Sequence, residues 1–437
     1  MRRLRLPLAS AMVVALAIPL LAGCTQGQAT SGAAATNPPP GQTSDPAAGR
    51  ATGTGIMPGY EDESVLAFTP LVIDTIGHEV VPVEGSDGLD WIAYELTVLN
   101  TSPRAATLTQ LETLEGDEHG AVIEKRDQAR LAANTMIVGD STTIMGGSSV
   151  IPTGRTAVIV LRDTYPSTDE VPKRIVHRLT ATFAPATPED GRLAPVYPDE
   201  VAQFGGAVVT GGRPPLVIGP PLAGANWVAT NGIETEALNM HSNVVIPVGG
   251  RLNAAEEYGI DFLRIDPSIP ATHVGDPSEN ASYLAFGEPL LAVADAKVLS
   301  VVSDRPDIAP GELPQLDSVD QATGNAVVLD LGDGVFALYA HMEQGSATVE
   351  PGDDVRRGDI IGRLGNSGNT SQAHLHFQLQ RGPLMTADNV PWVVDRFVAS
   401  GMISPDGERI VDAPRPGERV DEFPIGRSIS DFAELER

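Results

Sequence analysis

Short runs of alternating hydrophobic and polar residues dominate this chain, and the three-to-four-residue spacing of a long amphipathic helix is not evident. Three runs rich in β-branched and aromatic residues carry the strand pattern, at residues 65–73, 91–99 and 157–161. Turn-forming residues separate such runs, at 100–103, 139–140 and 152–154. The pattern therefore predicts a mainly β protein.

The spacing of these strands and turns indicates an antiparallel β-sandwich of immunoglobulin-like type in the first half of the chain. The second half contains a hairpin signal, because two alternating runs, 325–331 and 335–342, flank Gly332-Asp333-Gly334. In the second run Val335, Ala337, Tyr339 and His341 share one face. His341 can therefore face a groove while its neighbours fill a core.

The amino terminus has the form of an export signal. Three arginines within the first five residues precede an apolar stretch, 8–21, which is too short for a permanent spanning helix. The stretch ends in Leu21-Ala22-Gly23-Cys24, which resembles a bacterial lipobox, in which the cysteine is lipidated. A signal peptide cut at small residues is the alternative. We expect an exported protein anchored by acyl chains to the outer face of the cytoplasmic membrane, in the cell envelope.

Composition changes along the chain in a way that divides it. Residues 24–55 are mostly Gly, Ala, Thr, Ser, Gln and Pro and bury too little apolar surface to fold. A segment rich in proline and glycine lies between the two predicted folded regions. We predict a signal peptide at 1–23, a disordered tether at 24–55, a sandwich at 56–188, a linker at 189–225, a second domain at 226–400 and a C-terminal tail at 401–437 that packs along the surface.

Charge and cysteine content exclude some functions. The 437 residues carry a formal net charge of -28, and loss of three arginines with the signal peptide makes the charge more negative. Such a chain repels nucleic acid, so we expect no nucleic-acid partner. Cys24 is the only cysteine, which excludes a disulfide within the chain and a zinc site with thiolate ligands.

The candidate chemistry centres on His374-Leu375-His376, because two of eight histidines stand two residues apart in a strand-like segment. Residues i and i+2 of a strand project from the same face, so both imidazoles point into one space. This arrangement suits a metal ligand with a second imidazole working beside it. His78, His119 and His177 stand alone in the first half, and we expect them to be surface or packing residues.

The region from Gly259 to Gln380 resembles the lysostaphin-type zinc metallopeptidases, which cut peptide bonds in bacterial peptidoglycan. The resemblance rests on an ordered series of segments, which are Tyr258-Gly259-Ile260-Asp261-Phe262, residues 289–298, residues 324–330, Leu338-Tyr339-Ala340-His341-Met342, residues 355–362 and the run from Gly365 through the two histidines to Leu379. It implies an antiparallel β-sheet peptidase domain with a substrate groove. Residues 304–323 resemble an insertion between strands of that core, either a groove-edge loop or a surface excursion.

The resemblance assigns roles to four residues. It implies that Asp261 and His376 bind Zn²⁺, and that His374 and His341 flank the metal-bound water. Zinc lowers the pKa of its water and polarises the scissile carbonyl, while neighbouring imidazoles orient the water and stabilise the developing oxyanion.

One family ligand is missing from its usual place. The family pattern is His-x-Gly-x-Asp, whereas this chain has Glu257 four residues before Asp261. Glu257 could ligate, since residues i and i+4 of an extended strand share a face. His241 could instead enter from a preceding loop, with His273 as a more distant candidate. A metal-free site that only binds is the third alternative.

The sequence thus predicts a zinc-dependent metalloendopeptidase acting on cell-wall peptidoglycan or its stem peptides. The alternative is a catalytically inactive homologue that binds wall peptides or regulates another cell-wall hydrolase. A second alternative is an enzyme that cuts proteins or secreted peptides rather than the wall.

Overall fold

The computed structural model describes residues 69–435 apart from 78, 144–146, 235–237 and 269–270. The predicted signal peptide, Cys24, the tether and His78 lie outside the described residues. From Pro70 onward the chain forms one compact unit, and it is mainly β as predicted. Within the described ranges, no helix has the length and hydrophobicity needed to cross a membrane.

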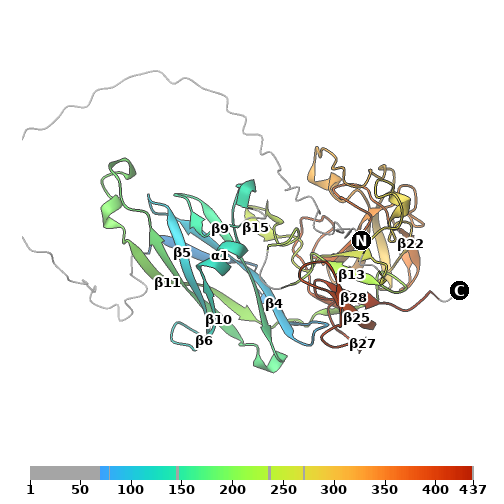
Figure 1. Ribbon diagram of the computed structural model, residues 1–437, viewed down its shortest axis with the longest axis horizontal. Coiled ribbons are helices and arrows are strands. Elements are labelled where there is room, and N and C mark those ends of the chain that lie inside the picture. Colours follow the sequence, from blue (N-terminus) through green and yellow to red (C-terminus); the bar gives the residue numbers. More distant parts are fainter. Residues whose placement is uncertain (1–68, 78, 144–146, 235–237, 269–270, 436–437) are drawn as a thin grey trace, which may run out of the picture. The chain divides into compact units, whose positions relative to one another are not determined.

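The first region, which we call the sandwich, consists of two sheets (Figure 1). One sheet contains β1 (Leu71–Ile76), β3 (Val83–Glu84), β4 (Asp90–Asn100), β7 (Thr135–Ile137) and β9 (Thr156–Tyr165), in the order β1-β4-β9-β7 with β3 beside β4. The other contains β2 (Glu79–Val80), β5 (Ala106–Glu115), β6 (Val122–Asp127), β8 (Val150–Ile151), β10 (Arg174–Phe183) and β11 (Glu200–Thr210), in the order β2-β11-β10-β5-β6 with β8 beside β5. Most pairings are antiparallel, and β2 runs parallel to β11.

Both sheets contribute to one hydrophobic core, so they pack face to face. Alternate residues of β4, including Ile92, Leu96 and Val98, meet Leu111 of β5 and Leu179 of β10 in that core. A short α-helix, α1 (Gln128–Asn134), follows β6, and the Asp127 carboxylate accepts a hydrogen bond from the backbone N–H of Arg130 at its N-terminus. The sandwich is established, while its immunoglobulin-like topology remains a prediction.

The second region, which we call the C-terminal domain, is built on an eleven-stranded sheet. Its strands are β13 (Trp227–Thr230), β16 (Ile260–Arg264), β18 (Ala296–Val302), β19 (Asn325–Gly332), β20 (Val335–Met342), β21 (Asp354–Val355), β23 (Leu375–Gln380), β25 (Phe397–Ile403), β26 (Ile410–Val411), β27 (Gly417–Arg419) and β28 (Ser428–Asp431). The order is β21-β18-β19-β20-β23-β16-β13-β28-β25-β26, with β27 beside β25.

Three small strand pairs complete the C-terminal domain. They are β12 (Leu216–Ile218) with β24 (Trp392–Val394), β14 (Val245–Val248) with β15 (Arg251–Ala254), and β17 (Pro289–Leu291) with β22 (Ile360–Arg363).

Single 3-10 turns occur in both regions, at Ser141–Thr143, Thr168–Glu170, Pro188–Asp190, Ala194–Val196, Asn280–Ser282 and Val319–Gln321. The predicted hairpin is present, and its turn residues Asp333 and Gly334 have positive φ angles of 51° and 72°.

The structure differs from two of the predicted boundaries. The segment predicted as a linker contains β11, which pairs with β10 along the sandwich, and β12, which pairs with β24. The segment predicted as a surface tail contains β26, β27 and β28 and contributes Phe423 and Phe432 to the main core. These C-terminal strands have two to four residues, which is too short for alternation to reveal them.

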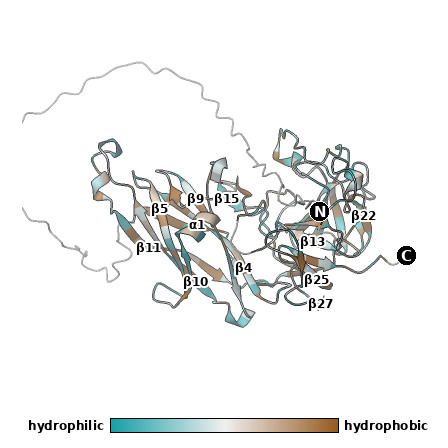
Figure 2. Ribbon diagram, viewed as in Figure 1, coloured by the Kyte–Doolittle hydropathy of each residue, from teal (hydrophilic) through white to brown (hydrophobic). Residues whose placement is uncertain are grey.

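Hydrophobic residues concentrate in the strands and hydrophilic residues in the connecting segments (Figure 2). The core of the C-terminal domain also takes in side chains from the sandwich, because Val83 and Trp91 belong to the same buried cluster as Trp392 and Phe423. A backbone bridge joins Gly85 to Phe423. The sandwich therefore contributes side chains to the core of the C-terminal domain, while its own two sheets enclose a separate core.

Candidate active site

Neighbouring strands of the large sheet bring the predicted site residues together. Strand β23 carries His376 and lies between β16 and β20. Asp261 of β16 pairs directly with His376 on one side, and Ala340 of β20 pairs with it on the other. Because directly paired residues have closely spaced side chains, the register alone places the carboxylate beside the imidazole.

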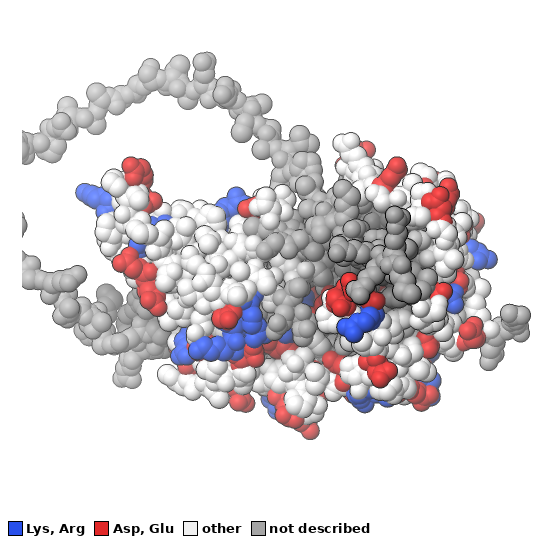
Figure 3. All heavy atoms as spheres, in the orientation of Figure 1, with Lys and Arg blue, Asp and Glu red and all other residues white. Residues whose placement is uncertain are grey.

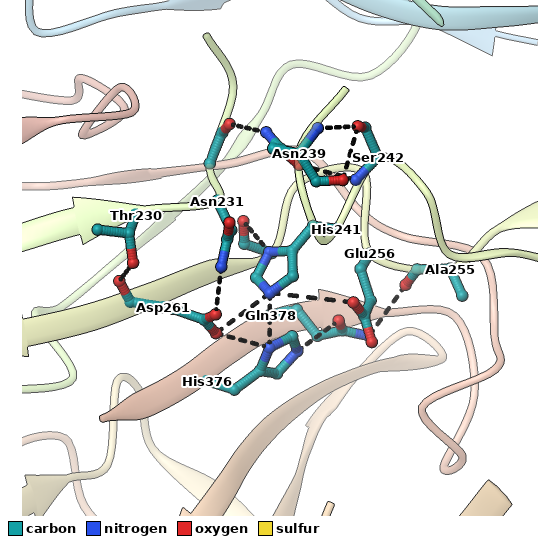
Figure 4. Close-up of polar contacts among 12 residues, drawn as sticks. Thr230, Asn231, Asn239, His241, Ser242, Ala255, Glu256, Asp261, His376 and Gln378 are labelled. Carbon is teal, nitrogen blue, oxygen red and sulfur yellow. Dashed lines mark hydrogen bonds and ion pairs between the residues drawn. The ribbon is translucent and has the colours of Figure 1, made fainter. Parts of the chain in front are cut away.

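Three ligand-type atoms converge at this point (Figure 4). Asp261 Oδ1 lies 3.0 Å from His376 Nδ1 and 3.1 Å from His241 Nε2. The two imidazole nitrogens are also 3.1 Å apart. All three residues are buried, with exposed fractions of 9% for Asp261 and 5% for each histidine.

His241 reaches the site from the segment before β14. Its Nδ1 lies 3.1 Å from the carbonyl oxygen of Gly259. Asn239 and Ser242 exchange backbone and side-chain hydrogen bonds, which hold the turn that carries the imidazole. A Cβ at Gly259 would lie 3.1 Å from His241 Nδ1 and 3.4 Å from His376 Cε1, so a larger residue here would crowd both rings.

A ladder of amide side chains fixes which nitrogen of His376 carries a proton. His376 Nε2 lies 3.0 Å from Gln378 Oε1. The Gln378 amide group donates to Ala255 O at 3.2 Å and to Gln380 Oε1 at 2.6 Å, so its oxygen faces the histidine as an acceptor. His376 therefore donates from Nε2, and its Nδ1 presents a lone pair to Asp261 and His241.

Similar contacts orient the other two groups. The Gly259 carbonyl accepts a hydrogen bond from His241 Nδ1, which leaves a lone pair on Nε2. Asn231 Nδ2 donates to Asp261 Oδ2 at 2.7 Å, which leaves Oδ1 for the shared point. Three lone-pair-bearing atoms at 3.0–3.1 Å repel one another unless a proton or a cation lies between them.

The donor set fits a zinc ion. Ligand atoms held tetrahedrally at about 2.0–2.1 Å from zinc lie about 3.3 Å from one another, close to the spacing found here. Two imidazoles and one carboxylate are also a usual zinc donor set.

Mutual attraction shifts the pKa values in this cluster. Burial by itself would lower the pKa of His241, but the Asp261 carboxylate outweighs it and raises that pKa to about 9. For Asp261, burial alone would raise the pKa, but His241 and then His374 hold it well below its usual range. The pocket thus favours an anionic carboxylate with positive charge beside it.

His374 and His341 lie next to this point. His374 Nε2 is 3.4 Å from Asp261 Oδ1, and the rings of His341 and His374 have centroids 4.6 Å apart. The Nδ1 atoms lie within 2.9 Å of backbone carbonyls, those of Gln372 for His374 and Ser367 for His341. Both histidines therefore keep an Nε2 lone pair for chemistry.

The two histidines differ in their electrostatic environment. Burial lowers the pKa of His341 well below its ordinary value, and His374 and His376 lower it further. For His374 burial also acts to lower the pKa, but the Asp261 carboxylate outweighs it, so the pKa is raised.

Simple strand alternation does not describe His341. Its φ is +61°, in the left-handed region, which costs a non-glycine residue roughly 1–3 kcal/mol. Hydrogen bonds from its N–H to Thr323 O and from the Gly365 N–H to its carbonyl hold this conformation. The β19–β20 register also shifts between Asn325 and Val327. This irregularity re-aims the imidazole, as bulges next to functional sites commonly do.

The structure does not bring Glu257 to the site. Residues 255–258 form a turn rather than an extended strand, and the Gly259 N–H donates to Glu256 O at 2.9 Å. The assumption that Glu257 and Asp261 share a strand face is therefore wrong. Glu257 instead lies 3.7 Å from Arg162 of β9, and burial together with Glu95 raises its pKa.

Glu256, which the sequence analysis did not single out, lies at the site instead. Its Oε2 is 3.9 Å from His241 Nε2, and one ligand atom each from His241, Glu256 and His376 lie within 4.8 Å of one another. His273 lies elsewhere, against the ring of Tyr283 at 5.3 Å between centroids. The predicted insertion, residues 304–323, borders the site, because Thr323 accepts from the His341 N–H.

Comparison with known proteins finds a family match within the C-terminal domain. The sequence model of Peptidase family M23 matches residues 283–387, a span that includes His341, His374 and His376 and begins after Asp261. Endolysin 2638A of Staphylococcus phage 2638A is 35% identical over 81 residues, which are 18% of this chain and 16% of the endolysin. The DD-carboxypeptidase/endopeptidase Mpg of Neisseria meningitidis is 40% identical over 55 residues, 13% of this chain and 12% of Mpg.

Two solved catalytic domains are similar in structure to a part of this chain. One is the prophage-encoded M23 protein EnpA from Enterococcus faecalis, with 20% identity, a TM-score of 0.23 and coverage of 39% of this chain and 92% of that one. Another is the peptidase lysostaphin from Staphylococcus simulans, with 21% identity, a TM-score of 0.20 and coverage of 33% and 80%.

Residues 283–387 of the C-terminal domain thus match Peptidase family M23. The chain's matches span less than a fifth of the curated relatives' own length.

Proposed function

We propose that this protein is a zinc-dependent endopeptidase that hydrolyses peptide bonds in cell-wall peptidoglycan. The observation that carries the proposal is the convergence of Asp261 Oδ1, His241 Nε2 and His376 Nδ1 within 3.0–3.1 Å of one another. The family domain and its similarity to an endolysin and a DD-carboxypeptidase/endopeptidase support the substrate class.

In this proposal His241, Asp261 and His376 hold the zinc ion. When bound, zinc supplies a Lewis acid that lowers the pKa of water and polarises a carbonyl. Gln378 and Gly259 keep the two ligand imidazoles in the required tautomers, and Asn231 holds the carboxylate.

His374 and His341 act beside the ion. Each is anchored through Nδ1 to a backbone carbonyl, so Nε2 is available to a substrate or to water. These imidazoles orient the attacking water and stabilise the oxyanion that develops on the scissile carbonyl. The strained backbone of His341 holds its ring close to His374 before substrate arrives.

The test combines metal analysis with wall hydrolysis. The full chain is expected to bind about one zinc ion tightly, to lose it on His376→Ala, and to release new amino termini from purified sacculi. His119→Ala is a matched control, because that histidine is exposed and lies in the sandwich. A chain without tightly bound metal would favour the inactive homologue that binds wall peptides. If the chain cleaved soluble peptides but released no amino termini from the sacculi, the result would favour an enzyme acting on secreted proteins.

We also propose that the protein is exported and anchored through a lipid on Cys24, on the strength of the Leu21-Ala22-Gly23-Cys24 segment. Replacing Cys24 with serine should move the chain from the membrane fraction to the soluble envelope fraction. Unchanged membrane association of that variant would contradict the anchor.

A further inference from the structure

The turn at residues 255–258 points two consecutive glutamates in opposite directions. Glu257 faces the sandwich, where Arg162 lies 3.7 Å away. Glu256 faces the site, with its Oε2 at 3.9 Å from His241 Nε2 (Figure 4). Glu256 is 7% exposed, so its carboxylate has largely lost contact with water. A buried carboxylate requires a compensating partner.

The partners of these buried carboxylates differ. Arg162 lies beside Glu95 at 3.0 Å and near Glu257, so a permanent cation accompanies that pair. Among the described residues, every ion-pair partner of Asp261 and Glu256 is an imidazole. Two buried carboxylates at one point therefore lack an arginine or lysine, and a divalent cation would balance both.

The surrounding structure holds Glu256 in this direction. The Tyr258 N–H donates to Asn389 Oδ1 at 2.8 Å, and the Ala255 carbonyl accepts from the side chains of Gln378 and Asn389. These contacts fix the turn on both sides of the glutamates. The same glutamine that orients His376 thus also anchors the turn that carries Glu256.

We infer that the Glu256 carboxylate is a fourth donor to the cation held by His241, Asp261 and His376. This inference rests on the proposed zinc site and extends it. The present 3.9 Å is slightly longer than the spacing of about 3.3 Å between zinc ligands, a difference that side-chain rotation of a glutamate covers. Four protein donors make a closed centre, whereas catalytic zinc sites keep one position open. Glu256 is therefore a built-in block that must move aside before hydrolysis.

The test compares two adjacent isosteric substitutions in the full chain. Glu256→Gln removes the donor charge, while Glu257→Gln makes the same change on the side facing Arg162. Competition with a chromophoric chelator measures the zinc dissociation constant of each. We expect it to rise at least about 10-fold for Glu256→Gln and to stay within about 2-fold for Glu257→Gln. Cobalt substitution gives a second readout, because the visible spectrum of bound Co²⁺ should change only in the first variant.

A third variant separates ligation from simple charge balance. Glu256→Asp keeps the charge but shortens the side chain, so a ligand role predicts weaker zinc binding and an altered cobalt spectrum. Wild-type affinity and spectrum in both Glu256 variants would overturn the inference, as would equal losses in Glu256→Gln and Glu257→Gln. A wild-type chain that binds no metal would instead refute the proposed function itself. Circular dichroism of each variant confirms that it is folded.

Discussion

Two clusters of buried polar side chains, one in the sandwich and one in the C-terminal domain, differ in how their buried charges are paired. In the sandwich, the Arg126 guanidinium contacts Asp163, and the Tyr94 hydroxyl lies 3.0 Å from the other oxygen of that carboxylate. His177 Nδ1 lies 2.8 Å from Gly206 O. The only formal charges in this cluster are therefore paired within the chain.

In the cluster of the C-terminal domain, the buried carboxylates are not paired with an arginine or a lysine among the described residues. Among the described residues, the ion-pair partners of Asp261 and Glu256 are all imidazoles, and three lone pairs converge. The comparison shows how to distinguish buried polarity that stabilises a fold from buried polarity that binds a ligand. The first is balanced by its own side chains, and the second, in the proposed function, would be balanced by a cation from outside.

The face drawn in Figure 3 does not reveal this difference. On the face that Figure 3 shows, acidic and basic side chains are interspersed, and this view of the described residues contains no broad basic area. In the proposed function the charge that matters lies inside, where a small number of unbalanced groups has a large effect.

The largest expected effect comes from the cluster in the C-terminal domain. Asp261→Asn should lower the rate of amino-terminus release from sacculi by about 1000-fold or more, because a metal supplies several kcal/mol of transition-state stabilisation. Treatment of the wild type with a chelator should give a similar loss that added zinc reverses. Asp163→Asn is the matched change in the sandwich and should leave the rate per folded molecule unaltered. Equal rates for wild type and Asp261→Asn would refute the distinction.

The next effect concerns the balanced cluster. Arg126→Met leaves the buried Asp163 carboxylate unpaired and should lower the free energy of unfolding by about 3–5 kcal/mol, as measured by urea denaturation. Zinc affinity of the folded variant should not change. Adding Asp163→Leu should restore much of the stability, because the double variant has no unpaired charge. A single variant as stable as the wild type would contradict the role of the pair.

A pH effect of similar origin should follow from His177. Burial lowers its pKa from about 6.5 to about 4, so the unfolded chain binds a proton more readily than the folded one between these values. Stability from the neutral imidazole is present above pH 6.5 and is lost as the pH falls toward 4, by about 3 kcal/mol. The free energy of unfolding should change less with pH over this window in His177→Asn, whose amide can still donate to Gly206. Parallel curves would contradict the assignment.

The smallest expected effect concerns the amide ladder beside the proposed metal site. Gln378→Met removes the acceptor that holds His376 in its tautomer and should weaken zinc binding by about 10–100-fold. Gln380→Met, one step further along β23, should have a smaller effect, measurable by the same chelator competition. A larger loss in the second variant would show that the ladder does not act through His376.

The sequence was most informative where strand geometry alone fixes neighbours. His374 and His376 share a face because they are two residues apart, and the family pattern aligned Asp261 with them. The structure brings all three together. His241 stayed one of several alternatives, because its arrival depends on the turn at 239–242 and on contacts with Gly259 that are distant in sequence.

Local conformation explains why Glu256, and not the predicted alternative Glu257, lies at the site. An extended strand was assumed before Asp261, but the strand begins at Ile260 and a turn precedes it. In an extended strand Glu257 would share the face of Asp261, whereas in the observed turn Glu256 faces the site. The hydrophobic pattern of Ala254, Ala255, Tyr258 and Gly259 does not distinguish the two conformations. Contacts from residues distant in sequence, such as Asn389 and Gln378, hold the turn.

The pairing of β12 with β24 has a practical consequence for dissecting the protein. The sequence suggests that a domain begins at residue 226, but a fragment starting there would lack β12. Trp392, which is fully buried in the intact chain, would then lose its strand partner on one side. It would also lose Val83 and Trp91 from the cluster around Phe423. Such a fragment should be poorly soluble, and its inactivity would reflect a broken interior rather than a missing regulatory partner.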